Sequence, residues 1–221
     1  MAESAAHLVD HVLPDVPVRQ WVVTFPWHLR YLFARNPALL RAVRRSVLRL
    51  LLAATRKRSG FAPRHSANTG ATCAVQRFGS ALSLNVHFHA LLLDGAYTSS
   101  AAGPPTFHLA PPPTDNEVEH LLLRIRTRVL HILRSTGYLE PATSDAPPTQ
   151  LELITAGAIQ GRSALGAEQE AAVTRLGPTV QHPAPEPSRR APLCASLDGF
   201  SLHAAVRIPA GMTPKASPAS M

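Results

Sequence analysis

The sequence is poor in cysteine, aromatic residues and long hydrophobic runs, and each shortage excludes a class of protein. Two cysteines in 221 residues cannot build a disulfide scaffold and are typical of a reducing, cytoplasmic location. The apolar run from Val47 to Ala54 is interrupted by Arg49 and is far shorter than the roughly 20 residues of a membrane span. No basic segment followed by an apolar one opens the chain, so no secretory signal and no membrane partner are predicted. The apolar fraction of 45% excludes a wholly disordered chain.

Acidic residues are absent between Val16 and Leu93, where twelve basic residues occur. The whole chain has a net charge of +8, but residues 140–221 hold six basic and seven acidic residues, so the positive charge belongs to the first half. All but two of the 22 basic residues are arginines, which make bidentate contacts to phosphate. Nucleic acid is therefore the favoured partner over a small molecule, although a solvated basic surface without a specific ligand stays open.

Strand and helix signals alternate in the first 139 residues and predict an α+β fold, an antiparallel sheet with flanking helices. Three runs are rich in β-branched and aromatic residues and end at turn or proline signals: Arg19–Pro26, Thr72–Phe78 and Val86–Leu93. The last two are expected to form an antiparallel hairpin, and Asp94-Gly95 to form the turn after it. Residues 1–15 show helical spacing that Pro14 ends.

Two longer amphipathic helices are predicted from their capping signals. The first begins after Asn36-Pro37 and runs to Gly60, and the second begins after Thr114, which forms a capping-box pattern with Glu117, and ends at Gly137. Basic side chains of the first helix lie mostly outside its apolar stripe. The predicted DNA-binding residues are four of these arginines and one in the second predicted strand: Arg41, Arg44, Arg45, Arg49 and Arg77.

After Leu139 the composition changes, because eleven of the 21 prolines lie there. Residues 140–198 are expected to be a loosely ordered, proline-rich linker or insertion, which makes the C-terminal region largely irregular. One strand is expected over Gly199–Pro209, within a remaining ordered piece at residues 199–211. Residues 212–221 are expected to be a disordered tail.

The chemistry that stands out is a pair of histidines in the third predicted strand. Alternate residues of a strand share a face, so His87 and His89 point the same way, about 7 Å apart along the strand. Two imidazoles so placed can bind one divalent ion and leave coordination positions open. The alternative is that the two are ordinary core or edge histidines. We favour the metal-binding interpretation because of the strand context, Gln76 on the neighbouring strand and the basic surface.

Long segments around these histidines resemble a known family. VRQWVVTFPWHLRYLFARNPALLRAVRRSV, then VQRFGSALSLNVHFHALLLDGAY and DGFSLHAAVRIPAG, closely resemble the rolling-circle insertion-sequence transposases of the two-tyrosine HUH type. HUH denotes His-hydrophobic-His, here His87, Phe88 and His89. The resemblance implies a Rep- or relaxase-like nuclease fold, with residues 1–139 a partial nuclease domain and residues 199–211 a remaining strand of it.

The resemblance also implies a mechanism. In that family the histidines hold Mg²⁺ or Mn²⁺, which polarises a phosphate of single-stranded DNA at the transposon ends, and a tyrosine then attacks to give a 5′-phosphotyrosyl link. A third polar ligand is usual. Gln76 is the candidate here and His203 a weaker one, and for each an ordinary polar side chain is an equal alternative.

The chain departs from the family pattern at two points. A cysteine-rich zinc module is expected before the first residues, and a tyrosine pair on a helix after the DGFSLHA strand, and neither is in the sequence. Tyr31, Tyr97 and Tyr138 form no spaced pair on a helix, so no catalytic residue is assigned. The favoured interpretation is a transposase truncated at both ends that lacks its nucleophile. The alternatives are a single-stranded nucleic-acid-binding protein without catalysis and a non-functional transposon remnant.

Overall fold

The computed structural model describes residues 13–61, 67–79, 84–100, 103–139 and 187–211. The expectations for most of the first predicted helix, for residues 140–186 of the linker and for the tail lie outside these residues. No helix in the described ranges is both long and apolar enough to cross a membrane.

One antiparallel sheet organises the structure, and β1 (Val18–Thr24) lies at its centre. The strand order is β2-β3-β1-β8-β7-β6, with β9 (Arg207–Ile208) also paired to β1. β2 (Ala71–Phe78) and β3 (Leu84–Leu93) form the predicted hairpin, which is confirmed. β1 pairs with β3 over its full length, from Val18 opposite Leu93 to Thr24 opposite His87.

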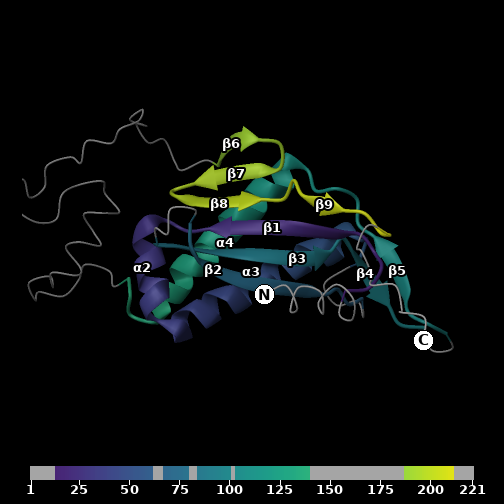
Figure 1. The fold of residues 1–221 in the computed structure, drawn as a ribbon, viewed down its shortest axis with the longest axis horizontal. Helices are drawn as coiled ribbons and strands as arrows, with labels where there is room; N and C mark the ends of the chain where they lie inside the picture. Colours follow the sequence, from purple (N-terminus) through teal and green to yellow (C-terminus); the bar gives the residue numbers. More distant parts are fainter. Residues whose placement is uncertain (1–12, 62–66, 80–83, 101–102, 140–186, 212–221) are drawn as a thin grey trace, which may run out of the picture.

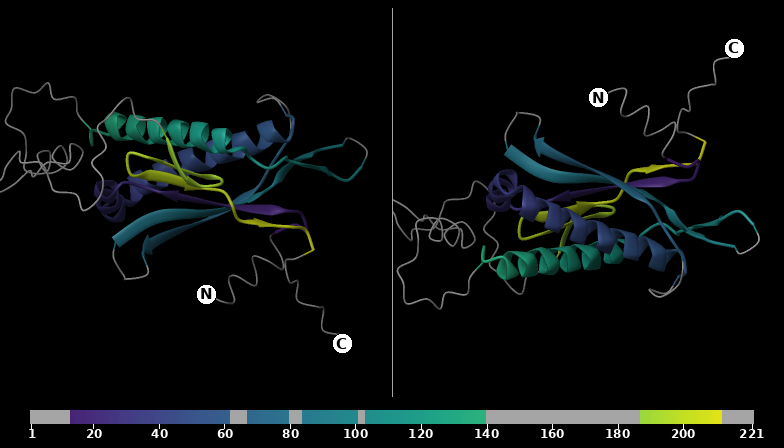
Figure 2. Two further views of the ribbon diagram at one scale, coloured as in Figure 1. Left: turned by 90° about the horizontal axis from the view of Figure 1, so that it is seen from above. Right: turned by 90° about the horizontal axis from the view of Figure 1, so that it is seen from below.

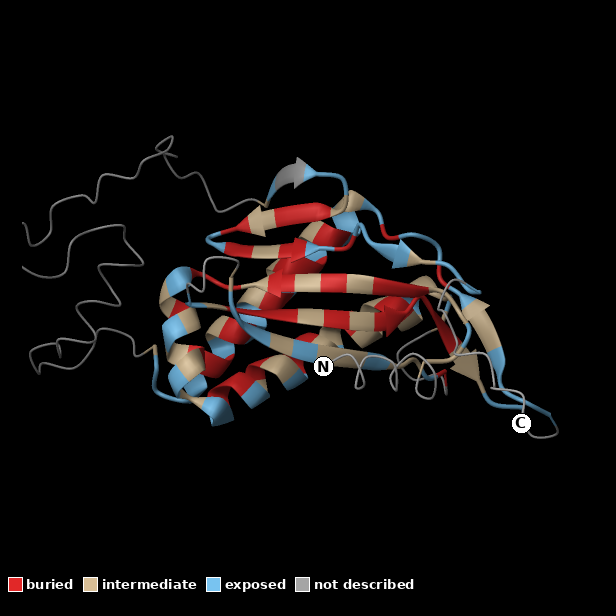
Figure 3. Cartoon of the chain, in the orientation of Figure 1, coloured by how far each residue is buried: buried red, intermediate tan, exposed pale blue. Residues whose placement is uncertain are grey.

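Two long helices cover one face of this sheet (Figure 2). α3 (Pro37–Arg58) and α4 (Asp115–Ser135) pack on the face that carries the even-numbered residues of β3 from Val86 to Leu92. α2 (Trp27–Arg35) lies at one end of the sheet, beyond β1 (Figure 1). Burial alternates along β1 and β3 and follows the inner side of each helix (Figure 3). The predicted α+β class, with an antiparallel sheet and flanking helices, is confirmed.

The two long helices begin where the capping signals predicted. The Asn36 side chain accepts a hydrogen bond from the Leu39 amide, and Thr114 and Glu117 form the complete capping box. Gly137 follows α4 with a positive φ of 75°, a conformation that glycine adopts without strain. α2 was not predicted as a helix, because its short sequence has no polar side chain at the N-cap, where Pro26 stands.

The C-terminal strands correct two expectations. β6 (Ser188–Ala191) and β7 (Cys194–Leu197) are ordered strands of the main sheet, so residues 187–198 are not part of a loose linker. The single strand expected over Gly199–Pro209 is two strands, β8 (Phe200–His203) and β9. β7 and β8 form a hairpin that packs against α4, which is why short, weakly patterned segments become ordered.

Asp94, expected with Gly95 to form the turn after the strand, is a bend between β3 and β4 (Gly95–Thr98), and Gly95 already belongs to β4. β4 pairs with β5 (Thr106–Leu109) in a separate two-stranded sheet. A Cβ at Gly95 would lie 2.3 Å from the Phe107 ring and 2.4 Å from the His108 carbonyl oxygen. The glycine is therefore required by the close approach of β5, and not by a turn.

Asp94 is the centre of a buried ion-pair cluster. Its side chain is 1% exposed and receives two hydrogen bonds from the Arg19 guanidinium, at 3.1 and 2.9 Å. Arg207 donates to it at 3.0 Å, and Arg58 lies 3.7 Å away. A further Arg19 nitrogen donates to the Ala204 carbonyl oxygen at 2.8 Å. One carboxylate thus joins β1, the end of α3 and β9 to the end of β3.

Replacing Asp94 by asparagine should strongly destabilise the protein. Removing one partner of a buried pair leaves uncompensated charge, so we expect Asp94→Asn to lower the free energy of unfolding by about 3–5 kcal/mol. Asp198→Asn is the matched control, because the Arg126–Asp198 pair is partly exposed and should contribute less than about 1 kcal/mol. Urea denaturation of both variants measures the difference, and equal losses would contradict the structural role given to Asp94.

His28 on α2 should make stability depend on pH. Burial lowers its pKa from the ordinary value of 6.5, and its Nδ1 is buried without a hydrogen-bond partner in the described structure. As the pH falls through the unfolded-state value, the unfolded chain binds a proton that the folded chain resists, so stability decreases. We expect His28→Gln to reduce the loss of thermal stability between pH 7 and pH 5.5. Identical pH profiles for the two proteins would contradict this assignment.

Candidate metal site on the open face of the sheet

His87 and His89 lie on β3, on the face of the sheet turned away from α3 and α4. Figure 1 views the sheet from this side, with both helices behind it. The neighbours Val86, Phe88 and Ala90 point into the core and are at most 1% exposed, which anchors the strand. The two imidazole rings are 4.9 Å apart between centroids, close enough for both to reach one ion. His87 is 8% exposed, and His89 is partly exposed.

Both imidazoles are held through Nδ1. The Nδ1 of His87 lies 2.6 Å from the backbone carbonyl oxygen of Asn85, which can only accept, so Nδ1 carries a hydrogen and, in the neutral ring, Nε2 has the free lone pair. The Nδ1 of His89 lies 2.8 Å from the Gln20 side-chain nitrogen Nε2, which can only donate, so in this orientation Nδ1 accepts. With the amide oxygen turned toward Nδ1, His89 also presents an unprotonated Nε2, and with the nitrogen turned toward it, Nε2 carries the hydrogen. Such a contact outside the ligand shell is what orients a metal-binding histidine.

Sequence reasoning missed Gln20. The alternation of β1 places Gln20 on the same face as Val22 and Thr24, so its face could have been predicted from the sequence. Its partner depends on the register, however, in which Gln20 stands opposite Leu91 and diagonal to His89. That register is decided by the pairing of β1 with β3, and the sequence of β1 alone does not contain it.

The electrostatics favour a neutral His89. Burial lowers its pKa, and the neighbouring His87 lowers it further because two adjacent positive charges repel. The neutral imidazole is the form that binds a metal ion. The lowered pKa therefore favours the neutral imidazole, while the orientation of the Gln20 amide decides which of its nitrogens carries the hydrogen.

The candidate third ligands lie on the same face at different distances from the pair. Gln76 stands directly opposite His87 in the β2–β3 register, but its amide nitrogen donates to the Phe78 carbonyl oxygen at 3.1 Å. His203 is separated from His89 by Val22 of β1, and its Nε2 lies 3.5 Å from the Cys194 sulfur. Within the described residues no three His, Cys, Asp or Glu side chains gather around one point. The donor set is therefore two imidazoles with an amide in reach.

A hollow of about 260 Å³ follows β1 beside the histidine pair. Thr24 and Ser201, whose hydroxyl oxygens are 2.7 Å apart, continue the polar row that contains Gln76 and His87. The exposed lining of the hollow itself is mostly apolar, so this face combines a polar row with an apolar hollow beside it. The lining residues are Gln20, Val22, Thr24, His203, Ala205 and Val206.

Comparison with known families identifies the chain. The family model described as "Putative transposase" matches residues 70–189, which is more than half of the 221 residues. The chain belongs to this transposase family. The matched range includes β2, β3 and α4, and hence both histidines and Gln76. No curated protein and no solved structure is significantly similar to the transposase chain.

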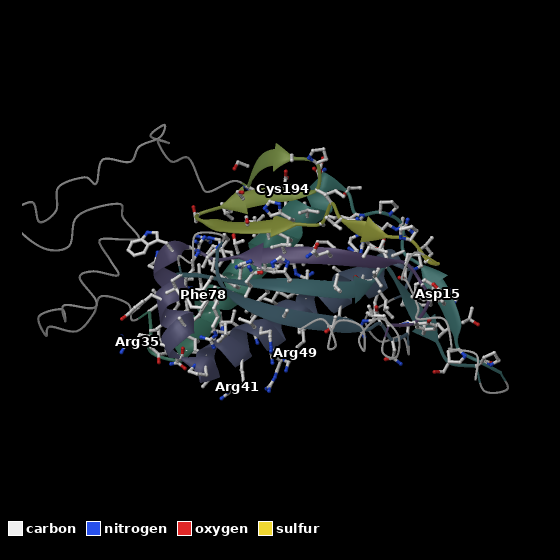
Figure 4. The ribbon with its side chains drawn as sticks, in the orientation of Figure 1. Asp15, Arg35, Arg41, Arg49, Phe78 and Cys194 are labelled. Carbon is white, nitrogen blue, oxygen red and sulfur yellow. The ribbon has the colours of Figure 1, made fainter. Side chains whose placement is uncertain are left out.

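The arginines predicted to bind DNA lie on the other side of this transposase's sheet. Arg41, Arg45 and Arg49 are exposed on α3, and Figure 4 shows Arg41 and Arg49 projecting beyond the sheet, away from the strands. Arg44 is partly exposed beside β2, where its charge acts against the burial that raises the pKa of the Cys73 thiol. Arg77 is exposed and donates to the Ala34 carbonyl oxygen of α2 at 3.2 Å. The structure therefore does not bring these arginines to the histidine pair.

The three tyrosines of the transposase have partners away from the histidines. The Tyr31 hydroxyl binds Arg35, which points outward from α2 in Figure 4. Tyr97 packs against Phe107 with tilted rings whose centroids are 5.0 Å apart, in the separate β4–β5 sheet. The Tyr138 hydroxyl binds Asn36, the N-cap of α3. These contacts stabilise the local fold and do not involve the histidine pair.

Substitutions at Gln20 should show that it positions His89. Gln20→Ala removes the contact to Nδ1, and we expect the affinity for Mn²⁺ to fall about tenfold or more. Gln20→Glu supplies an oxygen that can only accept, which fixes the hydrogen on Nδ1 of His89 and should preserve or strengthen Mn²⁺ binding. Isothermal titration calorimetry measures both. A loss of equal size in the two variants would contradict the positioning role.

Proposed function

We propose that this chain is a transposase of the two-tyrosine HUH type and that the open face of its sheet binds single-stranded DNA of transposon ends together with Mg²⁺ or Mn²⁺. The observation that carries the proposal is the His87–His89 pair, on a well-anchored strand, with both Nδ1 atoms held by hydrogen bonds. Such preorganised ligands are what a metal site requires. The location would be cytoplasmic, where the DNA is.

The residues present fit a weakly held divalent ion. His87 would hold it through Nε2, as would His89 once the Gln20 amide oxygen is turned toward its Nδ1. The Gln76 amide oxygen could join them after rotating away from Phe78. Imidazole is a better ligand for Mn²⁺ than for Mg²⁺, which prefers oxygen donors. When bound, the ion would neutralise and polarise a phosphate of the strand. The chain's own part is to orient the imidazoles, through Asn85 and Gln20, and to receive the strand along the hollow beside β1.

Strand cleavage needs a nucleophile as well as a metal ion. Tyr31, Tyr97 and Tyr138 are each engaged elsewhere, which supports the proposal that none of them attacks the phosphate. We therefore propose that this chain binds the strand and the ion but forms little or no covalent DNA adduct by itself. A tyrosine pair of the family would have to come from outside the described residues.

The second candidate function is single-stranded nucleic-acid binding without a metal ion. The polar row and the hollow beside β1 favour it, because they can receive a strand whether or not an ion is bound. The two functions differ in one measurable respect, the dependence of binding on Mn²⁺.

Removing the histidines should abolish the metal-dependent part of DNA binding. We expect Mn²⁺ to raise the affinity of the wild-type protein for a single-stranded oligonucleotide, and His87→Ala/His89→Ala to lose that gain while keeping the salt-sensitive part. His120→Ala is the matched control, since His120 is exposed on α4 and bonds its own helix backbone. Fluorescence anisotropy with and without Mn²⁺ measures each. Binding that never responds to Mn²⁺ would favour the second function.

Cleavage can be followed on the same oligonucleotide after labelling. We expect no covalent protein–DNA adduct with Mn²⁺ on a denaturing gel, because no tyrosine stands beside the histidines. An adduct would overturn the proposed absence of a nucleophile while supporting the metal site. Tyr31→Phe, Tyr97→Phe and Tyr138→Phe would then identify the residue.

A further inference from the structure

Six exposed arginines lie on the two long helices at positions outside the buried stripes, and together they are called here the helix-layer arginine surface. They come in equal numbers from α3 and α4: Arg41, Arg45, Arg49, Arg124, Arg128 and Arg134. None of the six forms an ion pair with any described carboxylate, since the ion pairs of the described residues involve other arginines. α3 contains no acidic residue, and those of α4 lie between Asp115 and Glu119, at its start.

The two helices run antiparallel, which brings the two sets of arginines together. Tyr138, just after α4, binds Asn36 at the start of α3, while Glu117 at the start of α4 acts electrostatically on Arg58 at the end of α3. The acidic start of α4 therefore lies by the far end of α3, and the basic remainder of α4 runs beside Arg41–Arg49. Positions four apart lie on one side of a helix, so the three α3 arginines span about 12 Å.

The two helices that carry these arginines cover one face of the sheet (Figure 2), and the strand alternation of β3 places His87 and His89 on the other face. A helix with its side chains is about 10 Å thick, so a strand over His87 and His89 could reach the arginines only by passing round the sheet edge. The helix-layer arginine surface therefore needs a ligand segment of its own, different from the nucleotides at the histidines.

The composition of the surface indicates the kind of nucleic acid. Proteins that hold single strands combine basic charge with aromatic side chains on which bases stack, and α3 and α4 contain no Phe, Tyr or Trp. Arginines without aromatics fit contacts to phosphates, which position a duplex without reading its bases.

We propose that the helix-layer arginine surface binds the phosphate backbone of duplex DNA, while the open face receives the single strand. The inference rests on the proposed function in one respect, that the protein acts on DNA. It adds a second substrate element, a double-stranded segment held separately from the strand at the histidines.

The test compares a blunt duplex of mixed sequence with a single-stranded oligonucleotide by fluorescence anisotropy. We expect Arg41→Gln/Arg45→Gln/Arg49→Gln to lower duplex affinity at least tenfold and to reduce the slope of log Kobs against log salt concentration by about 0.9 per lost contact, about 2.7 in all. The Mn²⁺-dependent gain in single-strand affinity should stay unchanged. The triple lysine variant, which keeps the charge, should retain most duplex binding, and melting temperatures identify any variant that fails to fold.

Two controls separate this inference from the proposed function. Arg35→Gln removes an exposed arginine outside the surface and should leave duplex affinity nearly unchanged. His87→Ala/His89→Ala should lose the Mn²⁺ effect on single strands and keep duplex binding. The proposed metal site and the proposed duplex-binding surface can therefore be refuted independently of each other. A folded α3 triple variant with unchanged duplex affinity and slope, or one that loses single-strand and duplex binding equally, would overturn the second surface.

Discussion

The carboxylate of Asp94 is the constraint on which the sheet depends. It is the acceptor for Arg19 of β1 and Arg207 of β9, and Arg58 of α3 lies beside it. The three arginines come from positions far apart in the sequence, and burying Arg19 and Arg58 without a counter-charge would cost far more than any one contact gains. The C-terminal strand, the central strand and the end of the first long helix therefore meet at one point.

This constraint also explains why the histidine pair is well placed. With β1 held at Arg19, its register against β3 runs unbroken from Val18–Leu93 to Thr24–His87. Gln20 is thereby brought beside His89, and the core residues Val86, Phe88 and Ala90 prevent β3 from turning. The same sheet separates two kinds of surface, a polar face with imidazoles and hydroxyls and a helical face with arginines. A DNA-binding protein with two such faces could bind one segment of its substrate on each face of the sheet.

The parts of the fold that could be predicted were those with a strong local pattern. The two long helices were predicted from Asn36, Thr114 and Glu117, because capping is an interaction among near neighbours in the sequence. The β2–β3 hairpin followed from two apolar runs of strand length. β6 and β7 could not be predicted, since Ser188–Ala191 and Cys194–Leu197 have little hydrophobic pattern. β7 is ordered by pairing with β8 and by packing against α4, and β6 by pairing with β7. Asp94 was taken for a turn residue because its three arginine partners are distant in sequence.

By itself, the sequence determined the α+β class, the common face of His87 and His89 and the basic character of the first half, because alternation, capping and charge are local properties. It also contained the segments by which the family can be identified. The tertiary structure decided what stands beside those residues. It placed Gln20 at His89, kept Gln76 in register with His87, and put the helix arginines on the opposite face from the histidines. These relations depend on strand order and register, which are set by contacts between residues far apart in the chain.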